Sequence, residues 1–412
     1  MQARTHDTAV SDLMARFAHE TGLSSTRDRP RRYLWTDAFA VCNFLELHRR
    51  TAQETYRQLA LDLAAQVHET LGKHREDDPR AGWISGLEER QGQRHPTAGG
   101  LRIGKKLGEQ KQDEPSDPRL GWDRDGQYYH YLTKWMHALH QMSAATGDPA
   151  FNQWGCELAK TAHRAFVYVQ HPGMPKRMYW KMSVDLSYPL VACMGHHDPL
   201  DGFVTYRELD RLAVEQSSSE SRSDLAGEIA DLAQMCRHAN WTTDDPLGIG
   251  GLLFDACRLL QMKADRSGFD DHGLLSTLLE SACVGLEMCL VGRGFMAAAD
   301  DRLAFRELGL TIGLHAVPMM CSLVEHGHGT AIDASIRSRL ERLVAHMPLC
   351  GTIETFWLDA ANRRSDSWHA HEDINMVMLA TSLAPEGFLT LDAGPRSHTP
   401  EIGEMSRVKG TR

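Results

Sequence analysis

Long segments of this chain place apolar residues every three or four positions, the period of a helix with one buried face. Charged residues occupy the opposite face, so these segments are expected to form outer helices. They cover residues 7–20, 52–73, 149–168, 203–216, 222–237, 271–290 and 332–346. Alternating runs of Val, Ile, Thr and aromatic residues, which indicate strands, are scarce. The pattern predicts an all-α fold.

Other segments carry apolar or small residues almost all round and have few charges. A helix that is apolar on every side is buried on every side. The segments are Ala38–Leu47, Pro189–Met194, Leu247–Leu260 and Leu308–Val324. Their alternation with the half-charged segments predicts two concentric layers, an inner ring of helices sheathed by an outer one.

Six times along the chain, an aromatic or bulky apolar residue followed closely by a polar group opens a long apolar helix pattern. The six openings are Trp35-Thr36-Asp37, Tyr128-Tyr129-His130, Val184-Asp185-Leu186, Trp241-Thr242-Thr243-Asp244-Asp245, Phe305-Arg306-Glu307 and Trp368-His369-Ala370-His371-Glu372-Asp373. From the second onward they recur about every 55 to 65 residues, the length of a helix pair with its loops. We therefore expect about twelve helices, six of them inner, in a single domain spanning residues 1–412.

Two stretches interrupt this rhythm, and the end of the chain departs from it. Residues 74–125 are rich in Gly, Pro, Asp, Arg and Gln but also contain Trp83, Leu101 and Ile103. Long loops of this kind are usually functional covers when they are ordered. We expect an ordered flap over the mouth of the ring. Residues 217–224 read as a polar connection, and the tail 396–412 is expected to fray.

Composition narrows the class of partner. The formal charge of −10 disfavours binding to nucleic acid or to an anionic membrane and favours a small ligand. No apolar run approaches the roughly 20 residues of a spanning helix, and the first residues lack the apolar middle of a signal peptide. We expect a cytoplasmic protein. The nine cysteines form no C-x-x-C pair and are expected to be reduced. No cofactor is predicted, and the oligomeric state stays open.

Acidic residues at the helix openings are the candidate catalytic groups. If the inner helices run parallel, their N-termini meet at one mouth, where unpaired N–H groups and the helix dipole can hold carboxylates close together. The candidates are Asp37, Asp185, Asp244, Asp245, Glu307, Glu372 and Asp373, with Asp123 and Asp125 in the loop before the second opening. N-terminal capping is the alternative for Asp37, Asp185 and Asp244, and most clearly for Asp245, which precedes Pro246. Glu307 could instead neutralise Arg302 or Arg306.

Tryptophans also gather at the openings, at positions 35, 122, 180, 241 and 368. An aromatic face beside carboxylates suits a sugar ring, whose C–H faces stack while its hydroxyls form hydrogen bonds. Packing in the core is the alternative for any single tryptophan. The expected substrate-binding residues are Trp35, Trp122, Tyr128, His130, Lys134, Trp241, Trp368, His369 and Arg102. Arg102 and Lys134 would anchor an acidic sugar.

Residues 367–375 form the densest polar cluster of the chain. His369 and His371 are spaced as metal ligands on a strand rather than on a helix, so we predict no metal site. Either histidine could carry a proton, since imidazole titrates near neutrality. Alternatively, Glu372 or Asp373 is the catalytic carboxylate and the histidines bind the substrate.

The openings resemble those of the six-hairpin (α/α)6 toroids of carbohydrate-active proteins, which include many glycoside hydrolases and the N-acylglucosamine 2-epimerase group. The resemblance covers about residues 7–390 and implies catalysis by residues at the inner-helix openings. In the epimerase group two histidines shuttle a proton, and Trp368-His369-Ala370-His371 is similar to the motif that carries one of them. The other stands in a Gly-His-x-x-Glu-Trp pattern, where this chain has Leu247-Gly248-Ile249-Gly250-Gly251-Leu252-Leu253. The missing histidine favours the hydrolases.

The leading hypothesis is a glycoside hydrolase acting on a short or modified oligosaccharide, with its acid and base among Asp37, Asp185, Asp244, Glu372 and Asp373. A sugar epimerase or isomerase that uses His369 or His371 as proton carrier is the alternative. A non-catalytic toroid that binds a ligand at its mouth is the third hypothesis. Separated pKa values among the carboxyl groups would distinguish an enzyme from a binding protein.

Overall fold

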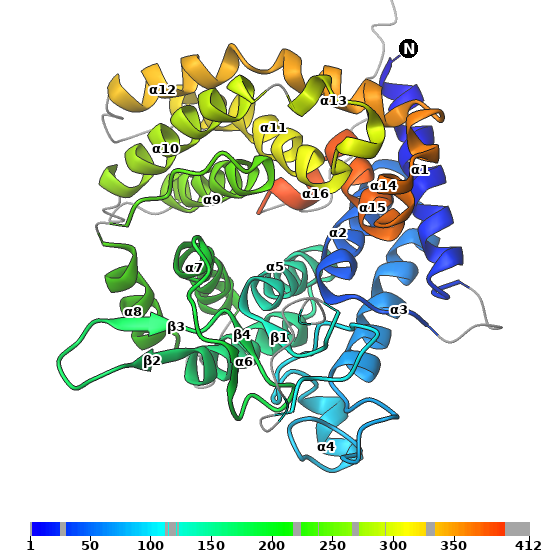
Figure 1. The fold of residues 1–412 in the computed structure, drawn as a ribbon, viewed down its shortest axis with the longest axis vertical. Helices are drawn as coiled ribbons and strands as arrows, with labels where there is room; N and C mark the ends of the chain where they lie inside the picture. The colour runs from blue at the N-terminus through cyan, green and yellow to red at the C-terminus, as the bar shows by residue number, and fades with distance from the viewer. Residues whose placement is uncertain are drawn as a thin grey trace, which may run out of the picture.

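The computed structural model describes residues 2–24, 30–111, 114, 121, 123–216, 224–237, 239–265, 272–292, 294–326 and 334–391. Within these residues, six helices pack side by side in a closed ring, each against the next and the last against the first. In ring order they are α2 (Leu34–Thr51), α5 (Tyr129–Thr146), α7 (Asp198–Gln216), α9 (Pro246–Asp265), α11 (Ala304–His326) and α15 (Glu372–Leu383). Figure 1 shows this ring from one end.

A second layer of helices packs on the outside of the ring. These are α1 (Gln2–Glu20), α3 (Glu54–Leu71), α6 (Pro149–Phe166), α8 (Ala226–Cys236), α10 (His272–Val291), α12 (Ala334–Val344) and α13 (Pro348–Leu358). Helix α1 packs on α15, α3 on α2, α6 on α5 and α7, α8 on α7, α10 on α9, and both α12 and α13 on α11. The all-α (α/α)6 toroid predicted from the sequence is confirmed.

Burial follows the two layers. In α2 every residue from Leu34 to Leu47 is buried, whereas in α3 the buried residues recur at the helical period. Glycines let two inner helices approach closely, because a Cβ on Gly250 of α9 would lie 2.0 Å from the carbonyl oxygen of Gly309 in α11. A Cβ on Gly313 would likewise meet Gly250. The long contact between α9 and α11 therefore requires these small residues.

The third inner helix is not where the sequence pattern placed it. Residues 184–194, expected to open and form an inner helix, instead make a turn and strand β5 (Pro189–Val191). Segment 203–216, expected in the outer layer, belongs to inner helix α7. The charged residues Glu208 and Arg211 of this segment are buried, so they resembled a solvated face only in sequence.

Short strands and small helices fill the loops. Strands β1 (Gln127–Tyr128), β4 (Lys181–Met182) and β5 form one antiparallel sheet, and β2 (Val167–Val169) pairs with β3 (Lys176–Met178). The remaining elements are α4 (Glu89–Arg94), η1 (Gly294–Met296), η2 (Ala299–Asp301), η3 (Asn362–Arg364), α14 (Asp366–His369) and α16 (Glu386–Leu389).

The predicted flap is ordered in its described part. Trp83, Leu101 and Ile103 are buried, and the backbone of Ile103 bonds to Leu34 at the start of α2 and to Gly126. These contacts tie the segment to the ring. The tail 396–412 and most of segment 217–224 lie outside the described residues.

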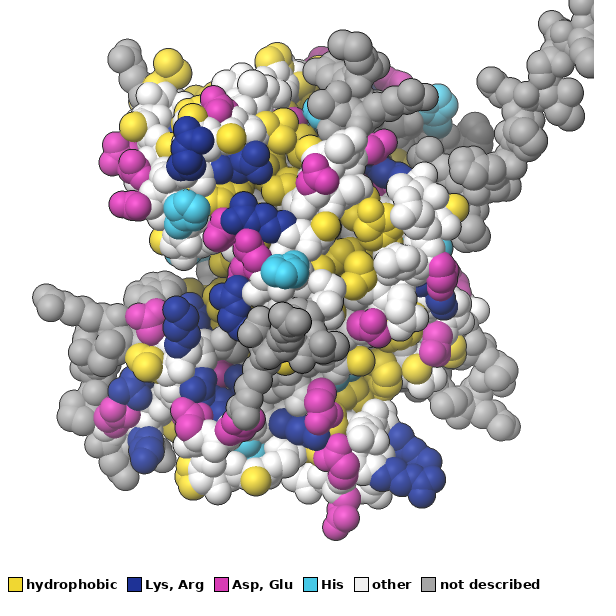
Figure 2. All heavy atoms as spheres, turned by 90° about the vertical axis from the view of Figure 1, so that its right-hand side faces the viewer, with side chains coloured by type: hydrophobic (Ala, Val, Ile, Leu, Met, Phe, Trp, Pro, Cys, Tyr) yellow, Lys and Arg dark blue, Asp and Glu magenta, His cyan; other side chains and the backbone are white. Residues whose placement is uncertain are grey.

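The surface is mixed in charge over the face that Figure 2 shows, where basic and acidic side chains are interspersed. Two helical segments, Gly273–Val291 of α10 and Ala304–His326, which is α11, are long and apolar enough to cross a membrane by length and composition. The expectation that no segment approaches this length is therefore wrong. Both are already packed in the toroid, α11 in its inner ring and α10 against α9 and α12.

Candidate active site

A cavity of about 340 Å³ opens among the N-terminal halves of the inner helices. All six inner helices line it, with at least one residue each. Examples, in ring order, are Trp35, Lys134, Asp201, Gly251, Ile312 and Met378. The expectation that the helix starts share one mouth is confirmed. Within the described residues, segment 74–125 supplies none of the lining.

Aromatic rings form much of the lining. Phe388 stacks on Phe39 and on Phe254, with ring centroids 4.3 and 4.4 Å apart. Trp35 lies against Phe39, and Trp180 faces the ring of His130 at 6.2 Å. A hollow with apolar rings on several sides can hold the C–H faces of a small ligand.

Asp198, at the start of α7, is the carboxyl group with the most unusual environment. Its side chain is buried, and its Oδ2 has no hydrogen-bond partner among the described residues. Burial, with the nearby charge of Asp201, raises the pKa of Asp198 to about 8 although Lys134 opposes the shift. The nearest ring nitrogen, Nδ1 of His130, is 3.7 Å from Oδ1. Asp198 is therefore protonated at neutral pH and lines the cavity.

Asp201, one helical turn further along α7, is in the opposite state. Burial alone would raise its pKa, but Lys134 and Arg258 lower the value to about 2. Lys134 Nζ donates to Oδ2 at 2.7 Å, and Arg258 Nη2 donates to Oδ1 at 3.0 Å. The hydroxyl of Thr133 also donates to Oδ2. Two carboxyl groups three residues apart thus have well-separated pKa values.

The charge network continues beneath the cavity around Arg258, whose side chain is fully buried. Its guanidinium donates to Asp201, to Glu208 at 2.9 Å and to Asp255 at 2.6 Å. Burial raises the pKa of Asp255 to about 6, although Arg258 opposes the shift. Burial also disfavours ionised Glu208, but His137 at 2.7 Å and Arg258 hold its pKa below the usual range. The buried cations and carboxylates are paired, as burial requires.

Three histidines line the cavity, His130, His196 and His197, and burial keeps two of them neutral. Burial lowers the pKa of both His197 and His130 to about 4. His197 Nε2 donates to the carbonyl of Trp241 at 2.9 Å, because a carbonyl can only accept. That bond leaves Nδ1 of His197 unprotonated, which is the form that a proton acceptor needs.

A glycine-rich face of α9 makes room for the cavity. Gly248, Gly250 and Gly251 all line it. A Cβ on Gly251 would meet no atom within 4 Å, whereas one on Gly248 would lie 2.9 Å from the methyl group of Thr243. The open space beside Gly251 therefore belongs to the cavity itself.

Three of the predicted binding residues meet in this cavity: Trp35, His130 and Lys134. Asp245, at the opening of α9, lines it as well. Its Oδ2 accepts the N–H of Gly248 at 3.3 Å, and its Oδ1 accepts Arg306 at 2.7 Å. Asp245 therefore caps the N-terminus of α9, which was the alternative interpretation of this residue. It also lines the cavity.

Asp37 and Asp244 lie outside the cavity lining. Asp37 is buried, accepts the N–H of Tyr33 at 2.8 Å and lies 3.5 Å from Arg32. Burial raises its pKa to about 6, against the effect of Arg32. Asp244 is exposed to solvent. In this structure, therefore, Asp37 ties down the start of α2, and Asp244 is an exposed residue outside the cavity lining.

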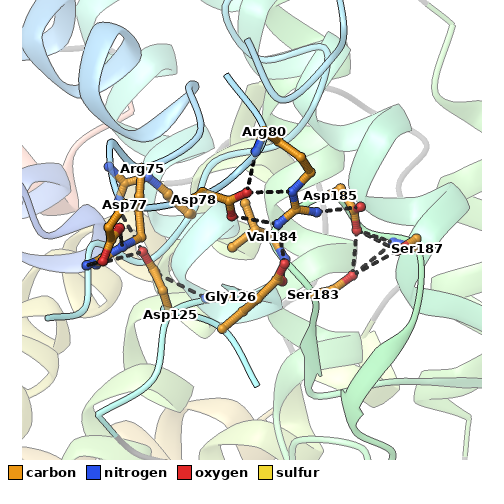
Figure 3. A network of polar contacts seen from close by, with 12 residues as sticks. Arg75, Asp77, Asp78, Arg80, Asp125, Gly126, Ser183, Val184, Asp185 and Ser187 are labelled. Atoms are coloured by element: carbon orange, nitrogen blue, oxygen red, sulfur yellow. Dashed lines mark hydrogen bonds and ion pairs between the residues drawn. The ribbon is translucent and has the colours of Figure 1, made fainter. Parts of the chain in front are cut away.

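Asp185 lies in the turn between β4 and β5, away from the lining residues. Figure 3 shows it between Arg80 and the serines 183 and 187. Arg80 donates to Asp185 at 2.7 Å, and Ser183 donates from its hydroxyl at 2.9 Å. Burial opposes ionisation, but the serine hydrogen bonds and Arg80 lower the pKa of Asp185. The expectation that Asp185 opens an inner helix is wrong, since it joins the flap to the strands.

The polar cluster before α15 lies outside the cavity lining. Glu372 accepts Arg16 at 2.6 Å, and Asp373 lies 3.4 Å from Arg31. The His369 side chain is 52% exposed. His371 lies edge-on to Phe305 at 5.3 Å, and burial lowers its pKa. None of the four cluster residues lines the cavity.

The other predicted binding residues support the ring or lie outside the described residues. Tyr128, Trp241 and Trp368 are buried without lining the cavity. Arg102 is also buried and pairs with Asp125 at 2.9 Å, so both hold the flap in place. Glu307 pairs with Arg302 at 2.7 Å and likewise does not line the cavity. Trp122 lies outside the described residues, and Asp123 is not among those lining the cavity.

Sequence reasoning missed Asp198, Asp201, His197 and Asp255. Helix α7 begins at Asp198, directly after His196 and His197. A signal was present, because Asp198-Pro199-Leu200 has the same sequence as Asp245-Pro246-Leu247 at the opening of α9. An acidic residue followed by proline is a helix-start pattern. Among the described residues, no group of three or more His, Cys, Asp or Glu could hold a metal ion.

No family model matches this chain, and no curated protein sequence matches it significantly. A solved sugar epimerase from a ruminal bacterium is similar over 93% of this chain and 98% of that chain, with 8% identity and a TM-score of 0.46. The unsaturated glucuronyl hydrolase of Bacillus sp. GL1, described as responsible for the degradation of glycosaminoglycan, is similar over 70% and 84%, with 15% identity and a TM-score of 0.32. Because these similarities are low, the function of this chain has to be inferred from its own residues.

Proposed function

We propose that this protein is a carbohydrate-active enzyme, and specifically a glycoside hydrolase with Asp198 as its general acid. The observation that carries the proposal is a buried carboxyl group, protonated at neutral pH, that faces a cavity lined by aromatic rings. A protonated carboxyl can give its proton to the oxygen of the leaving sugar. The separation of its pKa from that of Asp201 is typical of a catalytic site rather than of passive binding.

The neighbours of Asp198 have distinct roles in this proposal. Asp201 is held by Lys134, Arg258 and Thr133, so it is unsuited to attack the sugar. Its charge instead helps to keep the proton on Asp198. Asp245 lies at the opening of another helix that lines the same cavity, and we assign it as the carboxylate that activates water. Trp35 and Trp180 supply faces on which the sugar ring can stack.

A sugar epimerase or isomerase is the second candidate, and one observation favours it. His130 and His197 are neutral imidazoles that line the same cavity, and Nδ1 of His197 is available as a base. Such a base could remove a proton next to a carbonyl group. In the epimerase hypothesis, these two histidines replace His369 and His371, which do not line the cavity.

Substitution of Asp198 tests the proposal. After a panel of neutral and acidic oligosaccharides has been screened for turnover, Asp198→Asn should lower kcat by about 10²- to 10⁴-fold, the usual contribution of a general acid. Asp244→Asn, which changes an exposed carboxylate, should leave kcat within about twofold. An Asp198→Asn protein that is folded and fully active would eliminate Asp198 as the acid.

Solvent isotope incorporation separates the two candidates. In deuterated water, hydrolysis introduces no carbon-bound deuterium, whereas epimerisation places deuterium on the carbon that loses its proton. Mass spectrometry of the recovered sugar decides between them. Carbon-bound deuterium in the product would refute the hydrolase proposal and support His197 or His130 as the proton carrier.

A further inference from the structure

We infer that the sugar bound in this cavity is uncharged, and that saccharides bearing a carboxylate are rejected. This inference rests on the proposed function and specifies its substrate class. Among the described residues that line the cavity, four are aspartates and one, Lys134, is a lysine or arginine. Asp198 is uncharged at neutral pH, and the other three aspartates are each paired with a lysine or an arginine. The lining therefore has no free lysine or arginine with which to hold a carboxylate, and burying an unpaired carboxylate is costly.

Lys134, the one lysine or arginine among the described lining residues, is already paired. Lys134 Nζ donates to Asp201 at 2.7 Å and lies 5.7 Å from the ring centre of Phe254. Releasing this ammonium to bind a substrate carboxylate would leave Asp201 with Arg258 as its remaining charged partner, which is costly in a buried site. Lys134 is therefore unsuited to the anchoring of an acidic sugar that the sequence suggested.

The remaining basic side chains give no substitute. Arg306 approaches the cavity but is paired with Asp245 at 2.7 Å. Burial keeps His130 and His197 neutral. His196 also lines the cavity, but its Nε2 donates to the carbonyl oxygen of Asn240 at 2.6 Å. Arg102, the other predicted anchor, is paired with Asp125 away from the cavity. Helix N-termini supply partial positive charge, but the aspartates at the same helix starts offset it.

Asp198 shows that the cavity is built for a polar ligand rather than being a leftover gap. Asp198 lines the hollow, and its Oδ2 is buried without a hydrogen-bond partner among the described residues. A protonated carboxyl in this position can donate a hydrogen bond to a hydroxyl or ether oxygen. A cationic ligand would favour the ionised carboxyl and remove the proton that the proposed reaction needs, so an uncharged sugar fits best.

Matched ligands test the inference in the Asp198→Asn variant, which should bind without turnover. The probes are the methyl glucoside and methyl glucuronoside, and the corresponding galactose pair, examined by saturation-transfer NMR and by competition. At least one neutral glycoside should bind about tenfold more tightly than its uronate. A uronate that binds as tightly as its neutral partner would overturn the inference and leave the proposed function standing. The absence of binding by any saccharide in a wider panel would overturn both.

Two neighbouring aspartates provide a matched pair of charge variants. Asp245→Asn removes a charge from the lining and keeps a residue that can cap α9. It should narrow the neutral-to-uronate affinity ratio at least threefold. Asp244→Asn removes the same charge at an exposed position outside the lining and should change the ratio by less than a factor of about 1.5. Equal effects of the two variants would show that the local charge of the cavity does not select the substrate.

Discussion

Two inner-helix entrances of this protein contain histidines next to acidic residues, and they differ in almost every other respect. Before α15, His369 and His371 adjoin Glu372 and Asp373, and the acidic side chains pair with arginines from outside the ring. Before α7, His196 and His197 adjoin Asp198, which is buried at the wall of a cavity. The α15 entrance is denser in polar residues, yet the α7 entrance has the carboxyl group with a pKa near 8.

The difference lies in what surrounds each cluster. Arg16 is 49% exposed where it meets Glu372, so water screens that pair. Arg258 is fully buried where it meets Asp201, Glu208 and Asp255, so its charges interact strongly and must be balanced. A cluster of ionisable residues acquires unusual chemistry through burial and partners rather than through density in sequence.

Removing the arginine from each entrance should give the largest contrast. Arg258→Met leaves Asp201, Glu208 and Asp255 without their shared cation and should lower the free energy of unfolding by about 3–5 kcal/mol. Arg16→Met breaks an exposed pair and should cost about 1 kcal/mol or less. Urea denaturation measures both. Arg258→Lys should lower the free energy of unfolding by an amount between the losses for Arg258→Met and Arg16→Met. A loss below about 1 kcal/mol for Arg258→Met would show that the buried network does not depend on this arginine.

The pH dependence of stability should separate the entrances next. Asp198 has a folded-state pKa of about 8, above the value of about 3.9 expected in the unfolded chain. Its contribution to stability is therefore fully present below about pH 4 and is lost as pH rises towards 8. Asp198→Asn removes this loss. Between about pH 4 and 8, the free energy of unfolding of the variant, relative to that of the wild type, should therefore rise by up to about 1.4 kcal/mol per pH unit.

Thermal or urea unfolding between pH 5 and 8 measures this gain. His130 and Lys134 from α5 and Asp201 on α7 itself face Asp198, and the variant leaves all three in place. Glu372→Gln, at the solvent-facing entrance, should follow the wild-type curve within about 0.5 kcal/mol. Parallel curves for Asp198→Asn and the wild type would mean that Asp198 ionises normally in the folded protein.

The smallest expected effect comes from filling the open space beside Gly251, in the cavity that Asp198 also lines. Gly251→Ala introduces a methyl group where no atom lies within 4 Å, and alanine stabilises a helix by roughly 0.5–1 kcal/mol over glycine. We expect higher stability together with a KM raised several-fold, because the methyl group occupies ligand space. Gly351→Ala, at an exposed position of α13, also meets open space and should raise stability without changing KM. Equal KM values in the two variants would place the substrate away from α9.

Several parts of the fold followed directly from local pattern. The fully apolar segments in α2, α9 and α11 and the one-sided segments in α1, α3 and α6 were assigned to the correct layers, because burial on one or all sides leaves a helical period in sequence. Helix α7 was the exception. Its Glu208 is buried and paired with Arg258 of α9, and periodicity cannot distinguish such a buried charge from a solvated one.

The sequence by itself determined that this chain forms a two-layered ring of helices whose starts share a mouth, since the spacing of apolar residues sets which helix faces must be buried. It also placed Trp35, His130 and Lys134 at that mouth. Only the tertiary structure decided which acids matter. Lys134 and Arg258 lie 67 and 57 positions from Asp201 in the chain, yet both donate hydrogen bonds to it. The pKa of a carboxyl group depends on burial and on such distant charges, and neither is written in its immediate neighbours.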